Sequence, residues 1–238
     1  PTQLRKLFDT LKTKIDVKKV LLGGMEIPAD LVAHAESLGI ECYCGYGLTE
    51  MASTVCAKRA NATHGVGTPL SGREVLVEKR EILLRGAGLA SGYWQEGKLV
   101  TMTDEAGWFH TRDRGEWVEG ELHVLGRLDH MFISGGENVQ PEDIERVLAR
   151  HPHVDQAFVT SVPDTLYGAR PVAVIEGEAS FEGLREWVKD KLAVYQQPTS
   201  YYALPDTLKK EGIKISRRRL AAWVEERHAN DASSVSKK

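Results

Sequence analysis

The sequence has little cysteine, no long apolar run and no excess of charge of one sign. Its 238 residues include only three cysteines, at positions 42, 44 and 56. That odd number lacks the spacing of a zinc or thioredoxin-like site, so we expect small buried thiols in a reducing compartment. No apolar run approaches the ~18 residues of a membrane span, so no membrane protein is predicted.

The charge balance excludes a polyanion-binding role. Lys and Arg number 31 against 34 Asp and Glu, which gives a net charge of −3. No broad basic field is therefore available for nucleic acid or an anionic membrane, and local groups must hold any charged ligand. The hydrophobic share of 42% and the length together predict one or two domains with a real core.

The first 45 residues alternate between strand and helix patterns. An apolar run at 18–22 is stopped by Gly23 and Gly24. A helical pattern over 28–38 and a second strand at 40–44 follow. Strand, helix and strand with short connections predict a parallel βαβ unit, in which ligands bind at the carboxyl ends of the strands.

Two further regions follow. From about residue 66 to 125, short strands and turns predict a small antiparallel sheet or barrel. Residues 128–238 form an α+β pattern, with a helix from Pro141, strands at 157–162 and 172–176, and a helix near 181–192. A last helix is predicted from Ser216 to about Arg227, followed by a frayed polar tail.

Two segments in the first half carry candidate chemistry. Residues 45–50, GYGLTE, predict a glycine-punctuated turn after a strand. There the backbone could approach a ligand, Thr49 could meet a phosphate oxygen and Glu50 a divalent cation; a plain strand-to-helix turn is equally favoured. Asp113, predicted at a strand end, suits paired ribose hydroxyls, although an Asp that pins a turn is commoner.

Two segments in the second half carry the remaining candidate chemistry. Residues 126–145 join the β-rich region to the final unit, so a linker is expected at 127–129. Ser134 to Gly136 could form a loop over a ligand or a simple turn. Lys214, in a partly apolar setting, could stabilise charge on a phosphoryl or carboxyl group, or face solvent like most lysines.

In order and spacing, these four segments resemble the signature segments of the adenylate-forming acyl-CoA ligases. The segments GYGLTE, TRD and GRLDHMFISGGENVQPEDIE and the terminal Lys of GIKISRR carry the resemblance. It covers essentially residues 1–228. It implies an α/β fold in which residues 1–127 end the large nucleotide-binding domain, with a βαβ part and a small β-barrel-like part, and residues 128–238 form a small mobile α+β domain.

The resemblance also implies substrates and site residues. ATP with Mg²⁺ and CoA would be bound, with Thr49 and Glu50 at the ATP phosphates and Glu50 on the metal. Lys214 would bridge carboxylate and α-phosphate during adenylation. The remaining residues would line the adenine pocket (Gly23, Gly24, Gly45, Tyr46 and Gly47), hold the ribose (Asp113 and Arg127), border the pantetheine tunnel (Gly135 and Gly136) and form the hinge (Asp129).

The sequence departs from the superfamily pattern at three places. Ile213 and Arg112 stand where glycine is usual, and Arg112 suits either a dicarboxylate substrate or a structural ion pair. The Ser/Thr/Gly-rich phosphate loop has no counterpart, so we expect the carboxyl-terminal half of a cytoplasmic ligase, inactive alone. A non-catalytic nucleotide-binding module and a peptide-synthetase adenylation domain are the alternatives, and homo-oligomer formation is left open.

Overall fold

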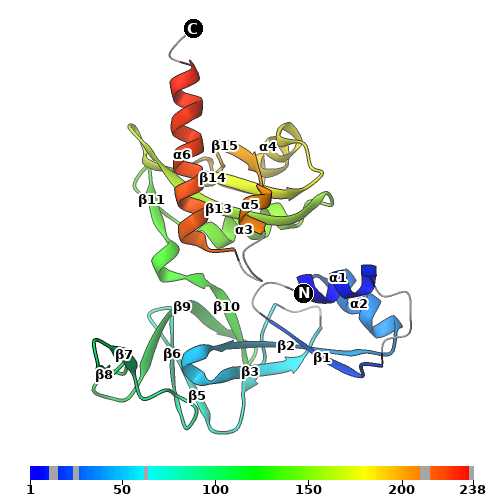
Figure 1. The fold of residues 1–238 in the computed structure, drawn as a ribbon, viewed down its shortest axis with the longest axis vertical. Helices are drawn as coiled ribbons and strands as arrows, with labels where there is room; N and C mark the ends of the chain where they lie inside the picture. The colour runs from blue at the N-terminus through cyan, green and yellow to red at the C-terminus, as the bar shows by residue number, and fades with distance from the viewer. Residues whose placement is uncertain (11–15, 24–26, 62–63, 210–214, 236–238) are drawn as a thin grey trace. The chain divides into compact units, whose positions relative to one another are not determined.

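The computed structural model describes residues 1–10, 16–23, 27–61, 64–209 and 215–235 (Figure 1). The chain divides into two compact units, Pro1–Leu125 and Gly126–Lys238. Both units combine helices and sheets, so the predicted α/β fold class is confirmed. The identification of these parts as a large domain and a mobile small domain stays a prediction. Among the described residues, no helix is long and apolar enough to cross a membrane.

The first unit begins with the predicted βαβ arrangement. Strands β1 (Lys19–Leu22) and β2 (Glu41–Leu48) pair in parallel, and helix α2 (Ala29–Ser37) connects them. Leu31 and Ala35 are four residues apart, so they lie on one face of α2 and are buried, together with Leu4 of α1 (Thr2–Thr10). All three cysteines are buried free thiols, as predicted.

Strand β2 is longer than its sequence pattern indicates. Residues 45–48 continue the strand, so the predicted turn there is wrong, and the chain turns only at the 3₁₀ helix η1 (Thr49–Met51). β2 pairs antiparallel with β3 (Ser53–Arg59), which pairs with β4 (Thr68–Pro69). The glycines permit close approach within the sheet: a Cβ on Gly47 would lie 2.1 Å from the backbone oxygen of Ser53.

A second sheet follows in the first unit, with strand order β10-β9-β6-β5. A hairpin joins β5 (Arg73–Glu78) to β6 (Glu81–Gly86), and its two turn residues, Lys79 and Arg80, have positive φ. The other two strands of this sheet are β9 (Phe109–Val118) and β10 (Glu121–Arg127). Strands β7 (Tyr93–Gln95) and β8 (Lys98–Val100) form a separate short hairpin, which the sequence pattern did not predict.

The second unit is built on the three-stranded sheet β13-β14-β15, with helices on both faces (Figure 1). The 3₁₀ helix η2 and a small hairpin precede it. Its elements are η2 (Leu128–His130), β11 (Phe132–Ser134), β12 (Glu137–Val139), α3 (Pro141–Ala149), β13 (Val154–Asp164), β14 (Gly168–Gly177), α4 (Phe181–Lys189), η3 (Val194–Gln196), β15 (Ser200–Ala203), α5 (Asp206–Lys209) and α6 (Arg217–Val235).

Alternate residues of β14 serve two separate cores. Val172 and Val174 pack with Leu220 of α6. Ala173 and Ile175 face the other way and pack with α3 and α4. Helix α6 continues to Val235, so the predicted end near Arg227 and the frayed tail directly after it are wrong.

We expect Gly47→Ala to destabilise the protein by about 2 to 3 kcal/mol, because the added methyl group collides with backbone that cannot move aside. Gly97→Ala is a matched control: Gly97 has φ +78°, and a Cβ there would meet nothing within 4 Å. That control should lose only about 1 kcal/mol, from left-handed strain. Urea denaturation measures both losses, and equal losses would contradict the packing explanation.

Candidate functional site

Thr49 and Glu50 lie in η1, directly after β2. The Tyr93 hydroxyl, from β7, donates a hydrogen bond of 2.8 Å to Oε1 of Glu50. This hydrogen bond raises the pKa of Tyr93, so the phenol stays protonated and remains a donor. The carboxylate of Glu50 is thus held in one orientation beside Thr49.

The acidic groups around Glu50 do not form a complete metal site. Within the part of the chain that the structure describes, no group of three or more His, Cys, Asp or Glu side chains could hold a metal ion. Mg²⁺ commonly binds through one or two carboxylates together with substrate phosphates. The single carboxylate of Glu50 fits that mode of binding and does not fit a cation cage made by the protein alone.

Asp113 lies in a bulge inside β9. Arg114 pairs with Glu81 and His110 pairs with Leu83, so residues 111–113 oppose the single residue Ile82. The prediction that Asp113 ends a strand is therefore wrong, and so is the alternative of an Asp that pins a turn. Such bulges bend a strand and redirect a side chain, often beside functional sites.

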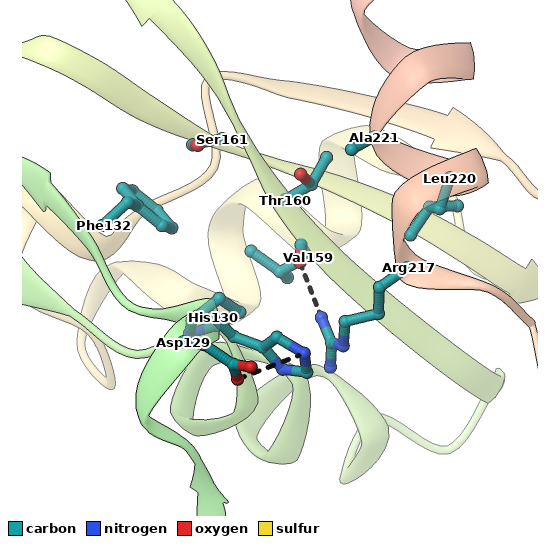
Figure 2. Close-up of a pocket in the computed structure, with 10 residues that line it drawn as sticks. Asp129, His130, Phe132, Val159, Thr160, Ser161, Arg217, Leu220 and Ala221 are labelled. Carbon is teal, nitrogen blue, oxygen red and sulfur yellow. Dashed lines mark hydrogen bonds and ion pairs between the residues drawn. The ribbon is translucent and has the colours of Figure 1, made fainter. Parts of the chain in front are cut away.

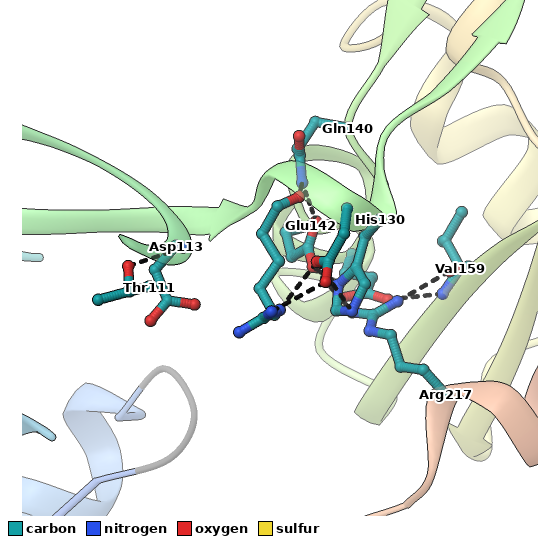
Figure 3. A network of polar contacts seen from close by, with 10 residues as sticks. Thr111, Asp113, His130, Gln140, Glu142, Val159 and Arg217 are labelled. Carbon is teal, nitrogen blue, oxygen red and sulfur yellow. Dashed lines mark hydrogen bonds and ion pairs between the residues drawn. The ribbon is translucent and has the colours of Figure 1, made fainter. Parts of the chain in front are cut away.

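Side chains and backbone within the bulge satisfy one another. The Thr111 hydroxyl donates to the Ile82 carbonyl at 2.7 Å and accepts the backbone N–H of Asp113 at 2.9 Å (Figure 3). Arg112, between them, has φ +62°, a left-handed conformation that costs a side chain about 1 kcal/mol or more. This left-handed conformation explains why a glycine would suit position 112. It gives no evidence for a ligand of the Arg112 side chain.

Tyr46 connects β2 to the Asp113 bulge. Its hydroxyl donates to Oδ2 of Asp113 at 2.5 Å. Burial, together with the charge of Asp113, raises the pKa of Tyr46 far above its ordinary value, so the hydroxyl remains a donor at every physiological pH. Tyr46 was predicted as part of a pocket lined by backbone, and no sequence signal pointed to its hydroxyl.

Gly23, directly after β1, also lies close to Gly45 inside β2. A Cβ on Gly23 would lie 3.3 Å from the carbonyl oxygen of Gly45. Of the predicted adenine-lining residues, Gly23 and the segment 45–47 are therefore adjacent at the carboxyl end of the parallel strand pair. Gly24 and the predicted catalytic Lys214 lie outside the described residues.

In the second unit, Arg127 and Asp129 bind each other. Nε and Nη2 of Arg127 each lie 2.9 Å from an oxygen of Asp129, a bidentate pair that lowers the pKa of Asp129. Gln140 donates to the backbone oxygen of Arg127 at 2.7 Å. The expected ribose contact of Arg127 and the hinge at Asp129 stay predictions.

Gly135 and Gly136 form the two-residue turn of the β11–β12 hairpin, with φ of +60° and +87°. The simple-turn alternative is therefore correct for their backbone. The ring of Tyr167 covers Gly135, where a Cβ would lie 2.7 Å from it. The expected border with the pantetheine tunnel stays a prediction.

A charged network that the sequence reasoning missed lies beside η2 (Figure 3). Glu142 accepts from His130 at 2.6 Å and lies 3.4 Å from Nη2 of Arg217. The same Nη2 lies 2.7 Å from Glu145, whose other oxygen accepts the backbone N–H of Val159. The spacing of Glu142 and Glu145 on α3, three residues apart, was the available signal, because i and i+3 share a helix face.

The two carboxylates of this network have opposite pKa shifts. Burial raises the pKa of Glu142, but the hydrogen bond from His130 and the charge of Arg217 outweigh it, so the net pKa falls. For Glu145, burial dominates over Arg217 and the pKa rises. Arg217 is therefore the cation that both partly buried carboxylates share.

A cavity of about 190 Å³ lies beside this network, between η2, β13 and the start of α6 (Figure 2). Arg217 and His130 supply its polar wall. Its apolar wall comes from Phe132 and Leu220. Of the predicted site residues that the structure describes, Asp129 alone lines this cavity.

Comparison with known protein families assigns both units. The model of the AMP-binding enzyme family matches residues 1–94, and the model of the AMP-binding enzyme C-terminal domain matches residues 143–213. The chain belongs to the AMP-binding enzyme family. The two matches fall in different compact units.

Curated members of this family are similar over nearly the whole chain. The 2-succinylbenzoate–CoA ligase of Escherichia coli K12 is 52% identical over 225 residues, which cover 94% of this chain and 50% of that protein. The enzyme of the same name from Haemophilus influenzae is 48% identical, covering 95% of this chain and 52% of that protein. The chain spans about half the length of the curated relatives it matches.

Solved structures of the AMP-binding family agree with this fold. A variant of Escherichia coli MenE with bound OSB-AMS is 52% identical with a TM-score of 0.88, covering 95% of this chain and 50% of that one. MenE from Bacillus subtilis in complex with ATP and magnesium ion is 28% identical with a TM-score of 0.71, covering 85% and 46%.

We expect Arg217→Met to destabilise this AMP-binding family member by about 2 to 4 kcal/mol, because it removes the guanidinium that pairs with the partly buried carboxylates of Glu142 and Glu145. Lys189→Met is the matched control. Lys189 pairs with Glu186 in water, with 59% and 72% of the two side chains exposed, so its loss should leave stability almost unchanged. Urea denaturation compares the two variants, and a loss for Arg217→Met no greater than the control's would contradict the assigned role.

Proposed function

We propose that this chain forms part of an o-succinylbenzoate–CoA ligase of menaquinone biosynthesis, a cytoplasmic enzyme that uses ATP, Mg²⁺ and CoA. The observation that carries the proposal is the 52% identity to the Escherichia coli 2-succinylbenzoate–CoA ligase over 94% of the chain. Support also comes from the Bacillus subtilis MenE complexes with ATP and magnesium ion and with the acyl-adenylate intermediate OSB-AMP.

In the proposed first step, a carboxylate oxygen of the acid attacks the α-phosphorus of ATP. The bond between that phosphorus and its bridging oxygen breaks, which gives an acyl-adenylate and pyrophosphate. Negative charge grows in this transition state, and preorganised donors and cations there lower the barrier. Lys214 would supply such a cation, and Thr49 would donate to a phosphate oxygen. Mg²⁺, held by Glu50 and the phosphates, would neutralise charge on the leaving pyrophosphate.

The ribose would be held by a carboxylate whose orientation is already fixed. Asp113 keeps one oxygen on Tyr46, so the phenol fixes the direction in which the carboxylate meets the ribose hydroxyls. Arg127 would assist it. Gly23, Gly24 and the backbone of residues 45–47 would border the adenine, where the absence of side chains leaves room for a flat ring.

In the proposed second step, the CoA thiol attacks the acyl carbon, AMP leaves with the bonding electrons, and the thiol proton is lost. The thiol must reach the place where Lys214 acted. Rotation at Asp129 would exchange the two faces of the second unit and bring Gly135 and Gly136 to the pantetheine. Such rotation must first separate Asp129 from Arg127.

Pyrophosphate release and CoA-thioester formation test the proposal. The natural protein that contains residues 1–238 should release pyrophosphate with o-succinylbenzoate and ATP, and should form the CoA thioester when CoA is added. Benzoate and fatty acids serve as competing substrates. Equal or faster turnover of those acids would sink the substrate assignment, and ATP binding without any thioester would favour a non-catalytic nucleotide-binding module.

Lys214→Ala in that protein should separate the two steps. We expect adenylation to fall about 100- to 1,000-fold, because a charge-stabilising donor is lost from the transition state. Thioester formation from supplied acyl-adenylate should persist. Lys189→Ala, which removes an exposed lysine of the same unit, should leave both rates unchanged. Equal losses in both steps for Lys214→Ala would count against its role.

A further inference from the structure

The bulge that presents Asp113 depends on one side chain from the neighbouring strand. Oε1 of Glu81, in β6, accepts the backbone N–H of Arg112 at 3.0 Å. Glu81 is the last paired residue before the bulge, and only 13% of its side chain is exposed. The Glu81 carboxylate therefore accepts the hydrogen bond that a backbone carbonyl would accept in a continuous strand pair.

The carboxylate of Glu81 is itself fixed. Its second oxygen lies 3.1 Å from Nδ1 of His110, and Nε2 of His110 lies 3.4 Å from Oδ2 of Asp104. The hydrogen bond to Glu81 raises the pKa of His110, which favours the form that donates from both nitrogens. Two backbone N–H groups, of Ala106 and Trp108, hold Asp104 in turn.

Glu81 supports the backbone at a residue with an unfavourable conformation. Arg112 has φ +62°, which a side chain rarely adopts, and Asp113 is the next residue. A change of the Arg112 backbone toward an ordinary conformation would move Asp113 and break its hydrogen bond with Tyr46. Position 112 carries no glycine, so an external acceptor is required to keep the strained conformation.

We propose that Glu81 is a positioning residue for nucleotide binding: its carboxylate holds the left-handed backbone of Arg112 and so fixes Asp113 for the ribose hydroxyls. The inference rests on the proposed function for its ligand. It deepens that function by adding a residue that touches no substrate. It also explains how this chain carries an arginine where the bulge favours a glycine.

The decisive experiment is a rescue. In the natural protein that contains residues 1–238, Glu81→Ala should raise the Kd for ATP about tenfold, because Asp113 is no longer held. Arg112→Gly removes the need for the hydrogen bond from Glu81, since glycine adopts φ +62° without strain. The double variant Glu81→Ala/Arg112→Gly should therefore return to within about threefold of the parent Kd. A double variant as weak as Glu81→Ala alone would overturn the proposal.

Two further variants separate positioning from general stability. Glu81→Gln keeps an acceptor oxygen for the Arg112 N–H and should stay within about threefold of the parent Kd. Glu74→Ala removes an equal charge from the same sheet, where Glu74 pairs with Arg85, and should leave the Kd unchanged. An unchanged Kd for Glu81→Ala, or a Kd raised as much by Glu74→Ala, would also overturn the proposal. Thermal unfolding shows whether each variant is folded.

The same measurements distinguish this inference from the proposed function. The parent protein is titrated with ATP before any variant. If it binds ATP but forms no CoA thioester, the proposed ligase function falls, while the comparison of Kd values still decides the role of Glu81. If the parent binds no ATP, the proposed function and the role of Glu81 in nucleotide binding both fall.

Discussion

The close approach of β3 to β2 is the constraint on which the first unit depends. At positions 45 and 47 a side chain would collide with backbone oxygens of β3. Because side chains alternate along a strand, Tyr46 points away from these two positions, and its hydroxyl reaches Asp113 in the other sheet. Residues 45–47 thus allow β3 to approach β2 closely and link the first sheet to the second.

Local patterns were sufficient where neighbours in sequence decide the structure. The βαβ arrangement followed from apolar runs and from Gly23 and Gly24, and the helix from Pro141 followed from its start signal and its apolar spacing. The GYGL segment was misread because turns and close backbone contacts both favour glycine. Only the position of β3 distinguishes these two uses, and no residue of GYGL encodes it.

The sequence likewise predicted only part of the candidate site. Residues 49, 50 and 113 were proposed from the sequence because carboxylates and hydroxyls suit phosphate, cation and ribose, and their ligand contacts stay predictions. Their setting was not found, since Arg112 gives no sign of a left-handed backbone and Glu81 lies 31 positions before it. The pair of Arg217 with Glu145 spans 72 positions and was invisible for the same reason.

The bulge in β9 has a consequence for how this sequence can vary in length. Three residues there oppose only Ile82, so two of them are surplus to the ladder. A deletion of residues 112 and 113 would leave one residue opposite Ile82 and allow a continuous sheet, while the carboxylate would be gone. Strand pairing and the proposed ligand contact of Asp113 are therefore encoded by different residues of the same strand.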